Sequence, residues 1–137
     1  MTVYVVDACS FIASLAGEPG GDNFVKVIQE ALDGSAAVKM NQINFLEVYY
    51  KIIHVYGLTE ADKLLSDIAD FPIEIITGMS ADVFREAGRL KSKYKIPLGD
   101  AVAAAECLVN NGLLVTADHH DFEPLATAEK LKVHWIR

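Results

Sequence analysis

The sequence predicts an α/β fold in which a mostly parallel sheet is wrapped by helices. Short apolar runs alternate with longer segments of helical periodicity, a pattern typical of successive strand and helix units. The chain has 137 residues, of which 52% are hydrophobic and 23% charged, and this is a globular composition. No repeat or linker interrupts the pattern, so we expect a single domain over residues 1–137.

The strands are short apolar runs, and the helices are longer segments between turn residues. In order, the predicted elements are strand 3–6, helix 8–17, helix 23–33, strand 36–40, helix 41–57, a helix from Thr59 to before Pro72, strand 73–77, helix 80–95, helix 100–112, strand 113–117 and strand 132–136. The sheet is therefore expected to have five strands.

Polar residues that accept hydrogen bonds from free backbone N–H groups mark the predicted helix starts. These N-caps are Asp22, Asn41, Ser80 and, in a capping box with Asp62, Thr59. Gly34 is expected to end helix 23–33, because glycine readily adopts the left-handed conformation after a helix.

Helix 41–57 carries an apolar face that we expect to point inward, although a carboxylate lies on it. This face consists of Ile43, Leu46, Tyr50, Ile53 and His54, and Glu47 lies beside them. Tyr49, Tyr56 and Trp135 are also expected in the core.

Four carboxylates occur in apolar segments where a folded α/β domain would normally avoid them. Asp7 follows strand 3–6, Glu47 lies in NFLEVYY, Asp100 opens DAVAAAE, and Asp118 follows strand 113–117. Burying one unpaired carboxylate costs several kcal/mol. Functional groups of parallel sheets gather beyond the carboxyl ends of the strands, where Asp7 and Asp118 are expected. Together the four acids predict a site for a divalent cation.

Each acid also has a structural interpretation when it is taken alone. Asp100 has the position of a helix cap, Asp7 that of a strand-end turn residue, and Asp118 that of a turn residue before Asp121. Their joint occurrence, with Ser10 close to Asp7 and Thr116 close to Asp118, favours the cation site.

The segments VVDACSFIA, NQINFLEVYY, YKIPLGDAVAAAECL and TADHHDFEPL resemble, in order and spacing, the four motif regions of PIN domains, and in particular the VapC-type toxins of VapBC toxin–antitoxin pairs. The resemblance implies a three-layer α/β/α sandwich and metal-dependent cleavage of RNA. It implies that Asp7, Glu47, Asp100 and Asp118 coordinate metal, with Asp121, Ser10 and Thr116 in support. It also implies a homodimer and an antitoxin partner, and helices 23–33 and 59–71 carry apolar residues that an interface would cover.

The donor set favours Mg²⁺ or Mn²⁺, which prefer hard oxygen ligands. A bound ion lowers the pKa of water, so no protein nucleophile is required. Accordingly, the sequence contains no glycine-rich phosphate loop and no zinc-type Cys/His spacing. His119 and His120, which precede Asp121, are expected to be solvated.

Two other functions compete with the ribonuclease. A phosphoacceptor domain of the receiver kind also has acids at strand ends, but it requires paired acids after the first strand and a lysine after a late one. A catalytically inactive module that binds RNA or protein would keep the fold without the chemistry.

Charge and cysteine usage indicate the compartment and the partners. The net charge of -7 argues against the broad electrostatic grip of a basic nucleic-acid-binding domain. The basic stretch from Arg85 to Lys95 is expected to be a solvated helix face. No run is apolar enough to span a bilayer, no secretory signal opens the chain, and Cys9 and Cys107 are expected as free buried thiols. We therefore expect a cytoplasmic protein without membrane contact.

Overall fold

Five strands form one sheet in the computed structural model, which describes residues 1–137. The strands are β1 (Thr2–Val6), β2 (Ala36–Asn41), β3 (Glu74–Ile76), β4 (Leu113–Thr116) and β5 (Val133–Trp135). Their order is β3-β2-β1-β4-β5, and every neighbouring pair is parallel. The five predicted strands are confirmed, and the carboxyl ends of β1 and β4 lie side by side.

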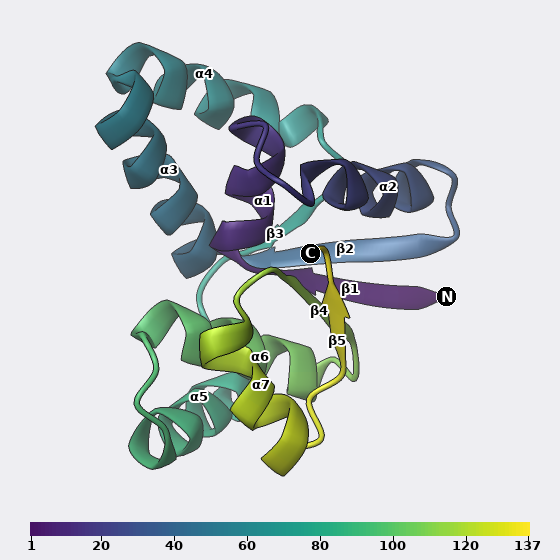
Figure 1. The fold of residues 1–137 in the computed structure, drawn as a ribbon, viewed down its shortest axis with the longest axis vertical. Helices are drawn as coiled ribbons and strands as arrows, with labels where there is room; N and C mark the ends of the chain where they lie inside the picture. The colour runs from purple at the N-terminus through teal and green to yellow at the C-terminus, as the bar shows by residue number, and fades with distance from the viewer.

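Helices cover both faces of this sheet and complete the expected α/β/α sandwich. They are α1 (Ala8–Leu15), α2 (Gly21–Leu32), α3 (Gln42–Tyr56), α4 (Leu58–Asp67), α5 (Ala81–Lys93), α6 (Leu98–Val109) and α7 (His119–Ala128), with a 3₁₀ turn at Ile68–Asp70. Helices α1 to α4 lie on one side of the sheet, and α5, α6 and α7 lie on the other (Figure 1). None of them is long and apolar enough to cross a bilayer.

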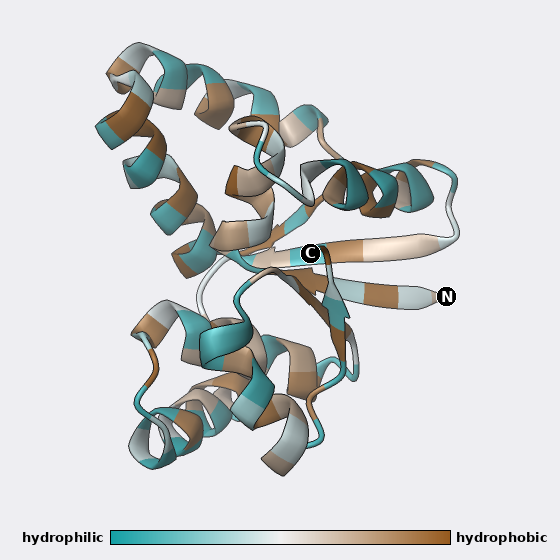
Figure 2. Ribbon diagram, in the orientation of Figure 1, coloured by the Kyte–Doolittle hydropathy of each residue, from teal (hydrophilic) through white to brown (hydrophobic).

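Alternating side chains of the central strand β1 pack into two separate hydrophobic cores, one on each side of the sheet. Tyr4 and Val6 pack with α1 to α4, whereas Val5 packs with α5, α6 and α7. This is the period of two that a strand imposes when both of its faces are covered. The helices are mixed in hydropathy along their length, as expected of elements with one covered face (Figure 2).

Several predicted helix boundaries are wrong, because a different residue occupies the N-cap. Gly20 rather than Asp22 precedes α2, and Gly57 rather than Thr59 precedes α4. Asp62 accepts a hydrogen bond from the Tyr49 hydroxyl instead of closing a capping box. The caps at Asn41 and Ser80 are confirmed, as is the left-handed Gly34 after α2. Helix α7 was not predicted.

The predicted inward face of α3 is also wrong. Ile43, Leu46 and Tyr50 are 37%, 54% and 53% exposed, and the buried positions are instead Asn44, Phe45, Val48 and Ile52. Both sets have helical spacing, so periodicity alone could not choose between them. Tyr56 and His54 are exposed as well, and Ile53, Tyr49 and Trp135 are only partly buried.

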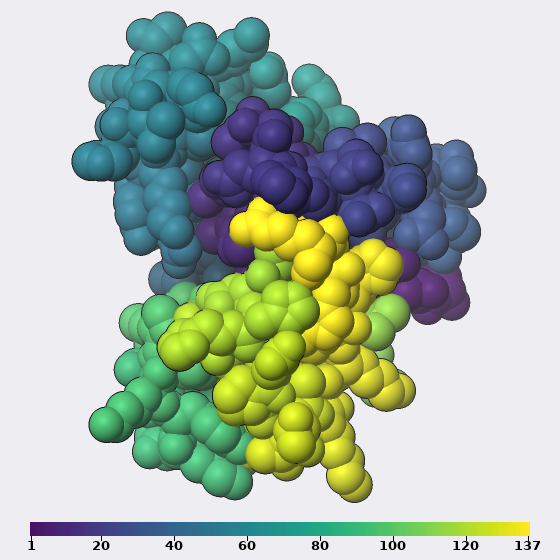
Figure 3. Space-filling view, viewed as in Figure 1, coloured from purple at the N-terminus to yellow at the C-terminus, as the bar shows by residue number.

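The C-terminal segment packs against the beginning of the chain, as Figure 3 shows where the last residues meet the first helices. The Arg137 guanidinium donates to the Pro19 carbonyl at 2.7 Å, and the Asn23 amide donates to the Ile136 carbonyl at 2.9 Å. These bonds fix β5, the edge strand beside β4.

Candidate metal centre

Asp7 lies between β1 and α1, where it caps the helix. It is 2% exposed. One carboxylate oxygen accepts the Ser10 backbone N–H at 2.9 Å, and the other accepts the Thr116 hydroxyl. The Ser10 hydroxyl donates to the Asp7 carbonyl at 3.2 Å. Of the expected supporting residues, Ser10 and Thr116 therefore contact Asp7 directly.

Asp118 occupies the equivalent position after β4. Its carboxylate accepts the Asp121 backbone N–H at 3.1 Å and so caps α7, while its own N–H donates to the Thr116 hydroxyl oxygen at 3.0 Å. Thr116 therefore joins the ends of β1 and β4. Asp7 and Asp118 each cap a helix and also lie at the same edge of the sheet.

Asp100 lies in the first turn of α6 but does not cap it. The N-cap is Pro97, and no side chain caps this helix. The alternative interpretation of Asp100 as a cap is therefore wrong. Instead, carboxylate oxygens of Asp100, Asp118 and Asp121 all lie within 4.8 Å of one another.

Crowding and burial shift the proton affinities of these acids. Burial raises the pKa of Asp7 to about 6, against the opposing effect of the hydrogen bonds from Thr116 and Ser10. Burial, a hydrogen bond with Asp121 and the charge of Asp7 raise the pKa of Asp100 to about 8. Burial also raises the pKa of Asp118. Each of these shifts favours the protonated carboxyl, as expected where acids are buried close together.

Glu47 lies beside this cluster and is not one of the three convergent acids. One of its oxygens is so close to Gly99 that a Cβ there would lie 3.0 Å from it, and the other pairs with the Lys51 ammonium at 3.0 Å. The structure thus brings Glu47 to the residue that precedes Asp100.

Glu106, Asn41 and Asn44 are further buried polar side chains, and of these the sequence singled out only Asn41, as a helix cap. Glu106 accepts from the amides of Asn41 at 2.8 Å and Asn110 at 3.1 Å, and the Asn44 amide donates to the Gly99 carbonyl at 2.9 Å. Glu106 was visible as a charge inside the apolar run DAVAAAE. Nothing in the sequence marked Asn44.

Other candidates have ordinary surroundings. His119 stacks on Trp135 with ring centroids 4.0 Å apart, and His120 is solvated. In the basic stretch, Arg89 and Lys93 pair with Glu129 at 2.7 and 3.2 Å. Cys107 is buried as expected, but Cys9 is only partly buried.

The donor set fits a hard divalent cation. It consists of carboxylate oxygens, which Mg²⁺ and Mn²⁺ prefer, and it holds neither a thiolate nor an imidazole. Burial is the main cause of the raised pKa values of Asp7 and Asp100, and repulsion from the neighbouring acids adds to it; a bound cation would oppose both effects.

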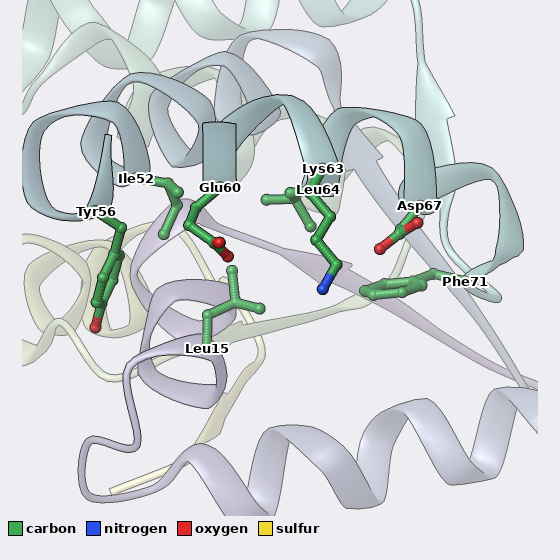
Figure 4. A pocket seen from close by; sticks show the side chains of 8 residues that line it. All are labelled: Leu15, Ile52, Tyr56, Glu60, Lys63, Leu64, Asp67 and Phe71. Carbon is green, nitrogen blue, oxygen red and sulfur yellow. The ribbon is translucent and has the colours of Figure 1, made fainter. Parts of the chain in front are cut away.

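An apolar trough runs along α3 on the α1 side. One pocket of about 300 Å³ lies between α1, α3 and α4, where Leu15 of α1 faces the charged Glu60, Lys63 and Asp67 of α4 and Phe71 lies near Asp67 (Figure 4). A second pocket shares Ile52 and Tyr56 with it and extends to Lys51. The lysine that pairs with Glu47 is therefore part of the lining of this trough.

Several known structures share this fold. The VapBC2 complex of Rickettsia felis bound to promoter DNA contains a chain with a TM-score of 0.76 and 18% identity, covering 97% of this chain and 98% of that one. The DNA-bound VapBC complex of Salmonella typhimurium has a chain with a TM-score of 0.75 and 11% sequence identity, and the match covers 100% of both chains. VapC20 of Mycobacterium tuberculosis is described as a sarcin-ricin loop cleaving toxin. Its TM-score is 0.67 and its sequence identity 14%, and the match covers 88% of this chain and 94% of that one.

A comparison with curated proteins gives no match. The family comparison, however, matches the PIN domain over residues 4–127, a range that contains every acid of the candidate centre. The strand order and the helices on both faces of the sheet agree with this match. The chain belongs to the PIN domain family.

Proposed function

We propose that this chain is a Mg²⁺- or Mn²⁺-dependent endoribonuclease, formed by a single domain of residues 1–137, and that it is the toxin of a toxin–antitoxin pair. The observation that carries the proposal is the convergence of Asp100, Asp118 and Asp121 within 4.8 Å beside the buried Asp7. Four acids at the shared end of two central strands are costly without a cation.

The proposed roles follow from position. Asp7, Glu47, Asp100 and Asp118 would hold the ion, with Asp121 completing the set. Ser10 and Thr116 would orient Asp7 through the bonds that they already donate to it. Such an ion, when bound, lowers the pKa of water and offsets the charge of a phosphodiester. The chain's own contribution is to hold the acids aligned and partly shielded from solvent.

RNA as the substrate is supported by the description of VapC20 as a toxin that cleaves the sarcin-ricin loop. The acidic net charge of -7 is compatible with this substrate, because the ion would neutralise part of that charge where the phosphate enters.

The decisive experiment is cleavage of a structured RNA by the purified protein with Mg²⁺ or Mn²⁺. EDTA should abolish cleavage, and Asp100→Asn should remove at least about 99% of it, since a misplaced or missing ion no longer stabilises the transition state, and losing such a stabilising group costs roughly 10²–10³ in rate. The matched control is Asp33→Asn, an exposed aspartate at the end of α2. Wild-type activity in Asp100→Asn would refute the assignment, and a metal-binding wild type without activity would identify the inactive binding module.

The antitoxin is proposed to occupy the trough along α3. The structures of VapBC complexes from several bacteria support a partner of this kind. Most of the lining residues are apolar and Lys51 also lines the trough, so a partner segment lying in it would pass beside the lysine that pairs with Glu47. Tyr56→Asp, at the junction of the two pockets, should leave RNA cleavage unchanged but weaken inhibition by the antitoxin encoded in an adjacent reading frame.

A homodimer is also proposed, and the exposed apolar stripe of Ile43 and Leu46 on α3 is its candidate surface. Helices α2 and α4, which the sequence favoured, expose Leu32 and Leu65 instead. Sedimentation of the wild type, Leu46→Asp and Leu65→Asp over a wide concentration range tests this choice. A monomeric wild type rejects the dimer, and dissociation by Leu65→Asp alone rejects the α3 stripe.

A further inference from the structure

Helices α3 and α6, which carry Glu47 and Asp100, meet at a specific polar contact. The Asn44 amide nitrogen donates to the Gly99 carbonyl oxygen at 2.9 Å. Asn44 lies one helical turn before Glu47, and Gly99 directly precedes Asp100. The contact therefore joins the two backbone segments from which these acids project.

The second feature of this contact is the absence of a side chain at Gly99. A Cβ at this position would lie 3.0 Å from a Glu47 carboxylate oxygen and 3.7 Å from the Asn44 amide nitrogen. The first distance is tighter than most real contacts of a Cβ, so a larger residue would shift the Glu47 carboxylate by a few tenths of an ångström. Glycine lets the start of α6 approach α3 this closely.

Asn44 is not an ordinary stabilising residue at this position. It is 1% exposed, and its carbonyl oxygen has no hydrogen-bond partner in the protein. An unpaired buried acceptor is unfavourable, and an apolar residue of similar shape removes that cost, which offsets the donor that the Gly99 carbonyl loses. The contribution that an apolar residue cannot reproduce is the bond to Gly99.

We propose that Asn44 and Gly99 are positioning residues, which hold the start of α6 against α3 so that Glu47 and Asp100 face the same ion. This inference rests on the proposed metal-dependent function, and it concerns geometry rather than contact with the substrate. It explains how an acid from each side of the sheet reaches a common edge, and it predicts that both residues act on metal affinity.

The test uses Mn²⁺ affinity, measured by calorimetry on the full chain, together with thermal melts in EDTA. Asn44→Leu should leave the melting temperature in EDTA equal to or above that of the wild type but weaken Mn²⁺ binding roughly tenfold or more, as loss of a residue that orients a ligand typically does. Gly99→Ala should weaken Mn²⁺ binding by a similar factor.

Gly88→Ala is the matched control for Gly99→Ala. Gly88 lies in helix α5, and a Cβ there would meet nothing within 4 Å. Both substitutions improve helix propensity, but only one crowds Glu47. Gly88→Ala should bind Mn²⁺ as tightly as the wild type.

The outcomes separate this inference from the proposed function. If the wild type binds Mn²⁺ and both Asn44→Leu and Gly99→Ala bind equally well, the positioning role is wrong and the metal site stands. If affinity falls only in variants that also melt lower in EDTA, the contact is structural and the inference is again wrong. If Asn44→Leu does not fold, Gly99→Ala decides alone. If the wild type binds no Mn²⁺, both proposals fail.

Discussion

Thr116 holds the Asp7 carboxylate from the neighbouring strand. Its hydroxyl donates to Asp7 and accepts the backbone N–H of Asp118 at 3.0 Å, so one hydroxyl on β4 aligns the acids that follow β1 and β4. Because a hydroxyl has one hydrogen and two lone pairs, donation to Asp7 and acceptance from Asp118 are compatible.

Thr116→Val should destabilise the metal-free protein by about 1–3 kcal/mol at pH 8, because the buried Asp7 carboxylate would lose a donor without losing its charge. The pKa of Asp7 should also rise further above about 6, since the Thr116 bond is the largest effect that lowers it. Urea unfolding measures the first change. Thr127→Val, on the exposed side of α7, is the control. Equal effects of the two substitutions would contradict a specific role of the Thr116 hydroxyl in holding Asp7.

The stability of the metal-free protein should fall as the pH rises from about 4 to 8. Asp7 and Asp100 have raised pKa values of about 6 and about 8 in the folded state. The folded protein therefore holds protons that the unfolded chain has already released above about pH 4, which favours unfolding as the pH increases. Unfolding free energies in EDTA at several pH values test this. Asp100→Asn should flatten the slope above pH 6, and an unchanged slope would show that Asp100 is not the titrating group.

Neutralising one acid should stabilise the metal-free protein against unfolding and weaken its affinity for the ion. Asp100→Asn or Asp118→Asn should raise the melting temperature in EDTA, because like charges that repel inside the protein are removed. Mn²⁺ at a hundredfold excess over its dissociation constant should stabilise the wild type by about 2.7 kcal/mol, and the variants by less. If Mn²⁺ leaves the wild-type melting temperature unchanged and neither variant melts higher in EDTA, these acids do not form one site.

Acid should weaken the attachment of α7 to α5. Hydrogen bonds from Arg89, Tyr94 and Lys93 lower the pKa of Glu129 to about 2. Such a group stabilises the fold above the pKa of the unfolded chain, and that contribution is lost as the pH falls from about 4 to 2. Glu129→Gln should therefore make stability less dependent on pH in this window, whereas Glu60→Gln, an exposed control on α4, should not.

The sequence predicted those parts of the fold and site that depend on local pattern. Asp7 and Asp118 follow apolar strands, and parallel strands bring such ends to one edge. Helix α7 was missed because two histidines and Pro124 are poor helix signals, and the helix depends instead on the Asp118 cap and on the burial of Phe122 and Leu125.

The relation between α3 and α6 could not be predicted from local pattern. Asn44 and Gly99 lie 55 positions apart, and their hydrogen bond exists only in the folded chain. The same holds for the orientation of α3, in which Ile43 and Leu46 form an apolar stripe as regular as the buried one. Packing against the sheet selects the face that contains Phe45 and Val48.

Glu47 and Asp100 belong to opposite layers of the sandwich, α3 on one side of the sheet and α6 on the other (Figure 1). Neither layer alone carries the complete set of acids. During refolding, tight ion capture must therefore wait until both layers have docked on the sheet, because binding free energy is gained only from an assembled site. In stopped-flow refolding, Mn²⁺ binding should therefore occur later than the recovery of helical circular dichroism. Ion binding would then mark the last step of assembly.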